Sequence, residues 1–266
     1  MKLLLIGDIV AKSGRQTITK ILPQVKEELN PDIVIGNAEN LSHGNGFCPD
    51  HIQEMQDAGI DFFTSGDHTW GNKNGIMMLN DSKFPVIRPA NYPSLDTPGS
   101  GYRIIEDGNM NKVLVISLLG RVFMKKDYDC PFRKFDQILQ ENAHERPSAI
   151  IVDFHTEATS EISAFGFYVD GRATAVFGTH THVPTADARV LQEGTAFMTD
   201  VGMTGPLDSV IGVKKDIIIN SFLTQMPVKH EPELEGSMVF NAAFLTIDEK
   251  SKKALNIYHV QKVIEL

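Results

Sequence analysis

Short apolar runs alternate in the first half of the chain with longer segments whose apolar residues recur at helical spacing. The apolar runs predict buried strands at Leu3–Gly7, Ile33–Asn37 and Phe62–Ser65. The segments between them predict helices over Gly14–Leu29, Pro49–Ala58 and Lys73–Leu79. Because proline suits the first turn of a helix and disrupts its interior, Pro23 is expected to end one helix and to open another.

The second half is richer in strands, and a proline-rich segment, Pro85–Pro98, precedes it as a predicted loop. Strands are predicted at Tyr102–Glu106, Val113–Leu118, Ala149–Asp153, Ala173–Phe177 and Ala196–Thr199. Helices are predicted at Phe132–Ala143 and Ser160–Val169, and a final hairpin at Val239–Ile247 and Ala254–Val263. This order predicts an α/β (α+β) fold, with two packed β-sheets flanked by helices in a single domain over residues 1–266.

Composition narrows the classes of function. The chain has 266 residues, of which 42% are hydrophobic, and a formal net charge of −9. Nucleic acids and anionic membranes usually require a basic face, so neither an extended nucleic-acid surface nor a membrane partner is expected. A single nucleotide held through metal ions stays open, because metals supply positive charge that the sequence does not show.

The sequence shows no motif for a signal peptide, a membrane span or a cysteine-based site. The apolar run Met1–Ile6 is too short for a signal peptide, and no run is long enough to span a bilayer, so a cytoplasmic location is expected. Cys48 and Cys130 lie far apart and form no Cys-x-x-Cys motif. They predict two partly buried free thiols, with neither a disulfide nor a structural zinc site.

The apolar runs end in side chains that bind divalent metals, and this is the strongest functional signal in the sequence. These side chains are Asp8, Glu39, Asn40, Asp67, His68, His155, His180 and His182. They supply the oxygen and imidazole ligands that divalent metals prefer. Because α/β proteins bind ligands outside the carboxyl ends of their strands, we expect one metal site collected from many strand ends.

Each of these residues taken alone has a simpler interpretation. Asp8 is a good helix cap, and a lone His155 is more often a hydrogen-bonded core histidine than a ligand. The pair His180 and His182 is more specific, because in an extended chain side chains two apart share a side. Gly178 before them permits close backbone approach.

In their order along the chain, these motifs resemble those of the calcineurin-like metallophosphoesterases. More narrowly they resemble the YmdB-like branch, bacterial enzymes associated with hydrolysis of cyclic nucleotide phosphodiesters. The motifs are Gly7-Asp8, Gly36-Asn37-Ala38-Glu39-Asn40, Gly66-Asp67-His68-Thr69-Trp70, Asp153–Glu161 and Gly178–Val183. Three further stretches fit the branch: Arg88–Asn91, Asp170–Ala173 and Thr199–Pro206. The resemblance runs from Lys2 to the final hairpin.

This resemblance implies a dinuclear centre in which Glu39 bridges two divalent or mixed-valence transition metals, Fe or Mn, with Zn as a further candidate. The implied ligands are Asp8, Asn40 and His182 for the first metal, and Asp67, His155 and His180 for the second. A metal-bridging hydroxide would attack phosphorus, and His68 corresponds to the proton donor. Mixed nitrogen and oxygen ligands agree with these metals.

Two positions depart from the wider pattern. The superfamily has Asp-x-His in its first motif, whereas Val10 stands here at the third position, as it does in the narrow branch. The branch usually has Asn in Gly-Asn-His, whereas this chain has Asp67. A third carboxylate should tighten metal binding and weaken the Lewis acidity that activates water.

The sequence therefore predicts a dinuclear metal-dependent phosphodiesterase acting on a small phosphate ester, a 2′,3′-cyclic nucleotide or a related cyclic nucleotide. Two alternatives stay open: a phosphomonoesterase on the same site, and a metal-binding regulatory protein with weak hydrolysis. The presence of His68 favours catalysis, because a metal store needs no proton donor. Leu41–Phe47 and Arg88–Pro98 are the candidate specificity loops. A homo-oligomer also stays open.

Overall fold

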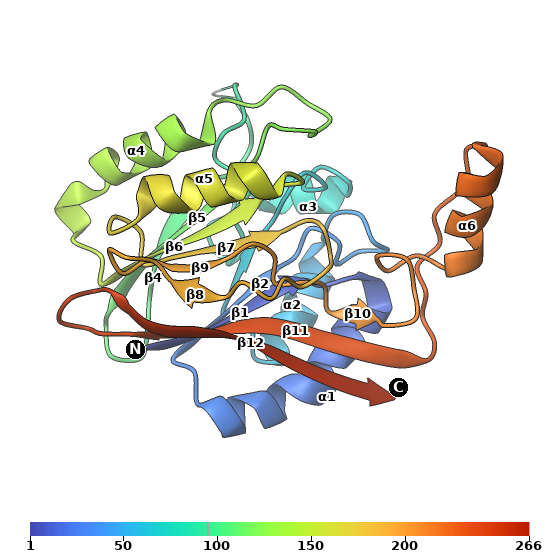
Figure 1. Ribbon diagram of the computed structural model, residues 1–266, viewed down its shortest axis with the longest axis horizontal. Coiled ribbons are helices and arrows are strands. Elements are labelled where there is room, and N and C mark those ends of the chain that lie inside the picture. The colour runs from blue at the N-terminus through green and yellow to red at the C-terminus, as the bar shows by residue number, and fades with distance from the viewer. Residues whose placement is uncertain (95, 266) are drawn as a thin grey trace.

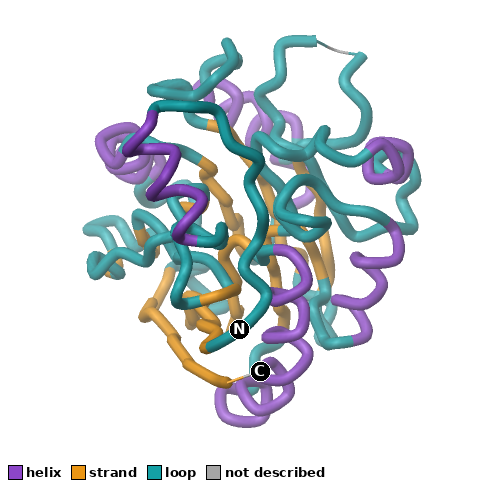
Figure 2. Tube along the Cα trace, turned by 90° about the vertical axis from the view of Figure 1, so that its right-hand side faces the viewer, coloured by secondary structure: helices purple, strands orange, loops and turns teal. Residues whose placement is uncertain are grey.

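Two six-stranded β-sheets pack face to face in the computed structural model, which describes residues 1–94 and 96–265. Helices lie over their outer faces (Figure 1). A view turned by 90° shows the strands in the interior with helices around them (Figure 2). The predicted fold class is confirmed.

The first sheet has a parallel centre and an antiparallel flank. Its strands are β1 (Lys2–Asp8), β2 (Ile33–Asn37), β3 (Phe62–Thr64), β10 (Gly205–Pro206), β11 (Ser237–Ile247) and β12 (Ala254–Glu265). The order is β10-β11-β1-β2-β3, and β12 pairs with β11 as the predicted tail hairpin. β1, β2 and β3 run parallel, so their carboxyl ends meet at one edge. The helices α1 (Ala11–Leu29), α2 (Pro49–Asp57) and α3 (Lys73–Met78) belong to this half.

The second sheet has the order β4-β5-β6-β7-β9-β8, with a parallel run from β5 to β9. Its strands are β4 (Tyr102–Glu106), β5 (Lys112–Leu119), β6 (Ala149–His155), β7 (Ala175–Thr179), β8 (Arg189–Val190) and β9 (Ala196–Met198). Its helices are α4 (Pro131–Glu141), a 3₁₀ turn at Ala143–Glu145, and α5 (Thr159–Val169). The predicted strands and helices are present with bounds shifted by a few residues.

Alternate side chains of β1 point to opposite faces of the first sheet, and each face packs against a different layer. Leu3 and Leu5 pack against the second sheet, whereas Leu4 and Ile6 pack under α1 and α2. A strand that is buried on both faces reads as a continuous apolar run, as this one does. A third apolar cluster joins the outer face of the second sheet to α4 and α5.

The prediction that Pro23 splits the first helix was wrong. α1 runs unbroken from Ala11 to Leu29 with Pro23 inside it. Pro23 faces solvent, while Leu22 and Val25 are buried in the core. Water can bond the carbonyl group that loses its partner on the exposed side, and packing of the buried side keeps the helix continuous.

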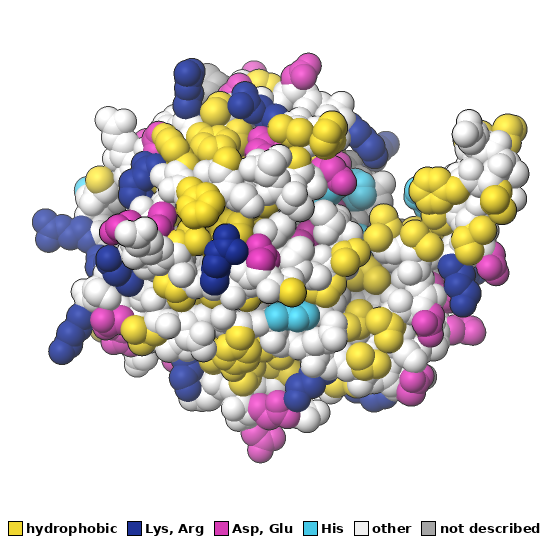
Figure 3. Space-filling model, viewed as in Figure 1, with side chains coloured by type: hydrophobic (Ala, Val, Ile, Leu, Met, Phe, Trp, Pro, Cys, Tyr) yellow, Lys and Arg dark blue, Asp and Glu magenta, His cyan; other side chains and the backbone are white. Residues whose placement is uncertain are grey.

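Helix α6 (Lys215–Thr224) was not predicted, and neither were the two-residue strands β8 and β10. Apolar residues occur on several sides of α6, but only Ile218 is buried, so the sequence shows no amphipathic face. The helix projects from the body (Figure 1), and hydrophobic side chains are visible on this arm (Figure 3). Phe222 and Leu223 of this helix are each 80% exposed.

Three smaller expectations can be compared with the structure. Cys48 and Cys130 are free and partly buried, as predicted. The segment Pro85–Pro98 contains neither helix nor strand in its described part; Leu95 lies outside the described residues. None of the helices in the described chain combines the length and the apolar character required to cross a bilayer.

Candidate metal centre

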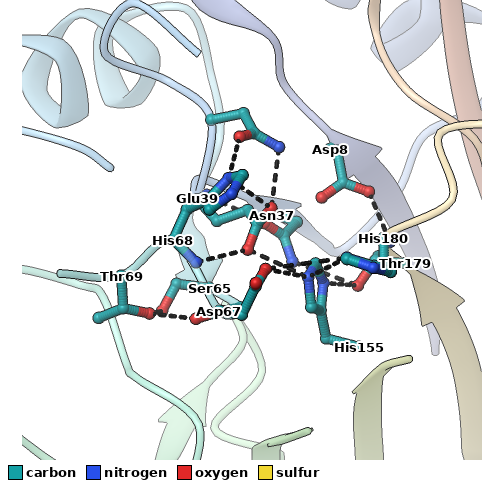
Figure 4. A network of polar contacts seen from close by, with 12 residues as sticks. Asp8, Asn37, Glu39, Ser65, Asp67, His68, Thr69, His155, Thr179 and His180 are labelled. Carbon is teal, nitrogen blue, oxygen red and sulfur yellow. Dashed lines mark hydrogen bonds and ion pairs between the residues drawn. The ribbon is translucent and has the colours of Figure 1, made fainter. Parts of the chain in front are cut away.

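Strands from both sheets end at one place and deliver the predicted polar residues there. Asp8 ends β1, Glu39 follows β2 and Asp67 follows β3 in the first sheet. His155 ends β6 and His180 follows β7 in the second sheet. Figure 4 shows these side chains converging on a common space. The backbone N–H of His180 donates a hydrogen bond to Asp8 Oδ2 at 3.0 Å, which joins the two sheets directly.

The described residues form two groups of potential metal ligands that share Glu39. The members are Glu39, Asp67, His155 and His180 in one group, and Asp8, Glu39 and His182 in the other. In each group one ligand atom of every member lies within 4.8 Å of the others. Every histidine, aspartate and glutamate that we expected as a ligand therefore lies in one of these groups.

Burial makes the negative charge of this site costly. Asp8 and Glu39 are almost completely buried, and Asp8 Oδ1 has no hydrogen-bond partner among the described residues. Burial raises the pKa of Asp8 to about 7, although the His155 imidazole acts to lower it. An unpaired buried carboxylate oxygen is unfavourable unless a cation compensates it. This oxygen fits a metal ligand.

His155 lies between Glu39 and Asp67 and carries the compensating charge in the protein alone. Its Nε2 is 3.1 Å from Glu39 Oε2 and 3.3 Å from Asp67 Oδ1. Burial acts to lower the pKa of His155, but the two carboxylates outweigh it and raise this pKa well above the usual value. Burial likewise acts to raise the pKa of Glu39, and His155 brings it down to about 2. A divalent cation held among these oxygens would supply the same compensation.

A hydroxyl relay fixes the ring orientation of His155. Thr179 Oγ1 donates to Asp153 Oδ1 at 2.7 Å, so it accepts the hydrogen bond from His155 Nδ1 at 2.8 Å. The Nδ1 atom therefore carries a proton, and Nε2 is the atom presented to the carboxylates. Metal-binding histidines usually donate their second N–H in this way, because that bond sets the tautomer of the ring.

The other two histidines show the same arrangement with different acceptors. His180 Nε2 lies 3.2 Å from Glu157 Oε2, which leaves Nδ1 facing His155 and Asp67. His182 Nδ1 donates to the backbone carbonyl of Ile211 at 2.9 Å, which leaves Nε2 toward the Glu39 group. Burial, together with the neighbouring His155, lowers the pKa of His180 to about 4, and burial lowers the pKa of His182. Both rings are thus neutral, the form that binds metal.

Asn40 and His68 form a pair at the exposed side of the site. Asn40 Nδ2 donates to Glu39 Oε1 at 2.9 Å and lies 3.1 Å from His182 Nε2. Its Oδ1 lies 2.8 Å from His68 Nδ1. Rotation of the amide by 180° exchanges oxygen and nitrogen, and the oxygen would then face His182, as the expected ligand role requires.

Two buried aspartates position the site, and the sequence reading gave neither a role. Asp153, on β6, accepts hydrogen bonds from Asn37 at 2.9 Å and from Thr64, both on the first sheet, so it joins the sheets beneath the ligands. Asp200 Oδ2 accepts from the backbone N–H of Thr181 at 3.0 Å and from its hydroxyl at 2.8 Å. Both aspartates lie inside motifs quoted above, and their apolar surroundings are the signal that identifies them as structural acceptors.

The expectation of an extended chain at His180 and His182 was wrong. Their φ angles are +108° and +66°, so the backbone turns sharply at both residues. Such angles are unfavourable for residues with a Cβ atom and occur preferentially at functional sites. The contacts of Asp200 hold this turn, which directs each imidazole to a different ligand group. The close approach expected at Gly178 is present: a Cβ there would lie 1.7 Å from the Thr199 carbonyl oxygen.

Comparisons with known proteins give a consistent result. A family model described as YmdB-like protein matches residues 4–260. A Bacillus subtilis protein named 2′,3′-cyclic-nucleotide 2′-phosphodiesterase is 41% identical over 260 residues, which cover 98% of this chain and 96% of that protein.

Two crystal structures share the whole fold. One, of a Thermus thermophilus protein described as hypothetical, has a TM-score of 0.91 and 37% identity, covering 99% of each chain. The other, described as a novel phosphatase from Mycoplasma pneumoniae, has a TM-score of 0.92 and 33% identity, covering 100% of this chain and 94% of that one. These matches confirm the resemblance read from the motifs: the chain belongs to the YmdB-like family.

Proposed function

We propose that this protein is a metal-dependent phosphodiesterase that hydrolyses 2′,3′-cyclic nucleotides within one domain spanning both sheets. The observation that carries the proposal is the pair of ligand groups that share Glu39, because a shared carboxylate can hold two cations beside each other. The name of the Bacillus subtilis relative supports the substrate class, and the Mycoplasma pneumoniae structure supports phosphate ester chemistry. The chain is thus a hydrolase of the metallophosphoesterase type.

The donor set fits two divalent transition metals. Asp8, Asn40 and His182 would hold one metal, and Asp67, His155 and His180 the other, with Glu39 between them. Three imidazole nitrogens among carboxylate oxygens favour Mn, Fe or Zn over Mg or Ca. Bound metals supply Lewis acidity that polarises a phosphoryl oxygen and lowers the pKa of water.

His68 is the proposed proton donor to the leaving alkoxide. Its side chain is 38% exposed, so its ring is accessible to a substrate. Its backbone N–H donates to Glu39 Oε2 at 3.2 Å, and its Nδ1 contacts Asn40. Because Nδ1 is engaged, Nε2 is the nitrogen that can transfer a proton to the alkoxide.

The first experiment tests the substrate class. The protein is stripped of metal, reloaded with Mn, Fe or Zn, and assayed on 2′,3′-cyclic nucleotides and on nucleoside 2′- and 3′-monophosphates. We expect hydrolysis of the cyclic diester and accumulation of the monoester, because the site is proposed to cleave a phosphodiester. Preferential hydrolysis of monoesters would indicate a phosphomonoesterase, and full metal loading without turnover of any ester would indicate a regulatory metal-binding protein.

The second prediction concerns metal content. Glu39→Ala should lose metal from both groups, because Glu39 is their common member. Elemental analysis of the purified variant measures the loss, and the exposed Glu27→Ala is the control for removal of a glutamate. Full metal content in Glu39→Ala would contradict the shared-ligand assignment.

A third prediction distinguishes proton donation from substrate positioning. His68→Ala should retain its metal, while turnover of a 2′,3′-cyclic nucleotide falls by about 10²–10⁴-fold, the usual contribution of a general acid. A nitrophenyl diester should lose much less, because its leaving group barely needs a proton. His144→Ala is the control, since the His144 side chain is 75% exposed and pairs with Glu145. Equal losses on both substrates would assign His68 to positioning.

The fourth prediction concerns Asp67, whose carboxylate is 10% exposed and contacts His155. Asp67→Asn keeps an oxygen ligand but removes a negative charge, so the dissociation constant of one metal equivalent should rise by roughly 10–100-fold, as for other changes that tune metal ligands. Competition with a chelator measures it. Asp208→Asn, at an exposed residue, makes the same change in net charge and should have no effect. If Asp67→Asn and Asp208→Asn retain metal equally well against the chelator, Asp67 lies outside the coordination shell.

A further inference from the structure

We propose that the cavity beside the metal centre, lined by Trp70, Tyr92 and Tyr128, is a nucleobase-binding subsite that selects nucleosides among phosphodiesters. The proposal rests on the proposed function and names the part of the substrate that lies outside the phosphate. In a 2′,3′-cyclic nucleotide the base is attached one ribose ring away from the phosphorus. A cavity that flanks the phosphate site is therefore where a base is expected.

The cavity has the size and surface of a small-molecule site. Its volume is about 400 Å³, within the usual range of 300–1,000 Å³ for ligand pockets. Ile76 and Pro93 add apolar surface beside the aromatic rings, and Lys126 and Asp127 supply exposed charged groups. A neighbouring cavity of about 500 Å³ is lined by residues such as Asn80, Ser82 and Arg103 and has no aromatic ring. Of these two cavities, the one lined by Trp70 and the two tyrosines offers aromatic rings on which a base can stack.

Covalent connection places this cavity next to the proposed proton donor. Trp70 is two residues after His68, and the Gly71 N–H donates to the His68 carbonyl at 2.8 Å in the same turn. The Thr69 hydroxyl lies 2.8 Å from Ser65 Oγ, which anchors this turn in the core. A base on Trp70 and a leaving group at His68 would thus be held by one rigid segment.

The pKa shifts of the two tyrosines agree with a position of the cavity near the metal centre. Burial raises the pKa of Tyr128, and the nearby Asp67 carboxylate raises it further. Burial also raises the pKa of Tyr92, and Asp67 again contributes. The proposed metal ligand and the two tyrosines are therefore close enough for its charge to act on both rings.

The three rings form a preformed aromatic array. Trp70 and Tyr92 meet edge to face with centroids 5.2 Å apart, and Tyr92 and Tyr128 meet in the same way at 5.2 Å. Such contacts fix the planes of the rings, so little side-chain entropy is lost when a flat ligand binds. Trp70 and Tyr92 are partly exposed, whereas Tyr128 is 7% exposed and packs against Tyr92. Stacking accepts any base, because every base has a π-face.

A kinetic experiment separates base recognition from a structural role of Trp70. Trp70→Leu keeps an apolar side chain and removes the aromatic ring. For 2′,3′-cyclic AMP we expect KM to rise by about 5- to 150-fold with kcat nearly unchanged, the equivalent of one lost stacking contact. For a methyl riboside 2,3-cyclic phosphate, which has no base, both constants should stay at the wild-type values. Phe167→Leu, at a residue 64% exposed on α5, is the control.

Two kinetic results would overturn the proposal. Equal losses on the two substrates would assign Trp70 to the structure of the turn. Equal kcat/KM of the wild-type protein for the two substrates would show that the cavity does not bind the base.

A binding experiment tests the base subsite independently of catalysis. It remains informative even if no cyclic nucleotide is hydrolysed, which is the result that would refute the proposed function. Trp70 is the only tryptophan in the chain, so tryptophan fluorescence, excited at wavelengths that tyrosine does not absorb, reports on this cavity alone. Adenosine 3′-monophosphate should quench this fluorescence in the metal-loaded protein with saturation, and ribose 3-phosphate should not. Absence of saturable quenching, or equal quenching by both compounds, would refute the base subsite.

Discussion

The constraint on which the structure depends is the burial of three carboxylates at the seam between two sheets. Asp8, Glu39 and Asp67 lie where water cannot solvate them well, and ions of like charge at such a place require a cation. The protein provides one positive imidazole, His155, in the middle of them. Two metals would satisfy this demand more completely. The strand ends, the sharp turn before His182 and the buried acceptors all serve to bring these charges together and hold them.

The site also depends on the orientation of its histidine rings. Each histidine proposed as a ligand gives the N–H of its second ring nitrogen to a different kind of acceptor: a threonine hydroxyl for His155, a carboxylate for His180 and a backbone carbonyl for His182. The acceptors come from separate segments, so each ring is fixed independently. The close fit extends to Gly66, where a Cβ atom would lie 2.2 Å from Glu39 Oε2. The turn that carries Asp67 can approach the shared carboxylate only because this residue has no side chain.

Most of the fold, and the clustering of the candidate ligand residues, could be predicted from the sequence, because buried strands and the polar residues that end them leave a strong local pattern. The failures have physical reasons. Packing of the buried side of α1 tolerates Pro23, and this packing depends on distant residues. Helix α6 has no buried face to produce periodicity. The left-handed backbone at His180 depends on Asp200, a partner twenty residues away that sequence spacing does not reveal. The cavity beside Trp70 is likewise formed by segments that meet only in three dimensions.

The origin of the ligands in both sheets has a consequence for how the protein reaches its native state. Glu39 and Asp67 follow strands of the first sheet, whereas His155 and His180 belong to the second. Neither half alone presents a complete ligand group, so metal uptake at this site would come late in folding, after the sheets have docked. A ligand that binds only the native state stabilises it by mass action. Metal availability would therefore set the lifetime of the docked sheets as well as the rate of chemistry, and the metal would act as a cross-link that adds to the contacts of His155 with Glu39 and Asp67.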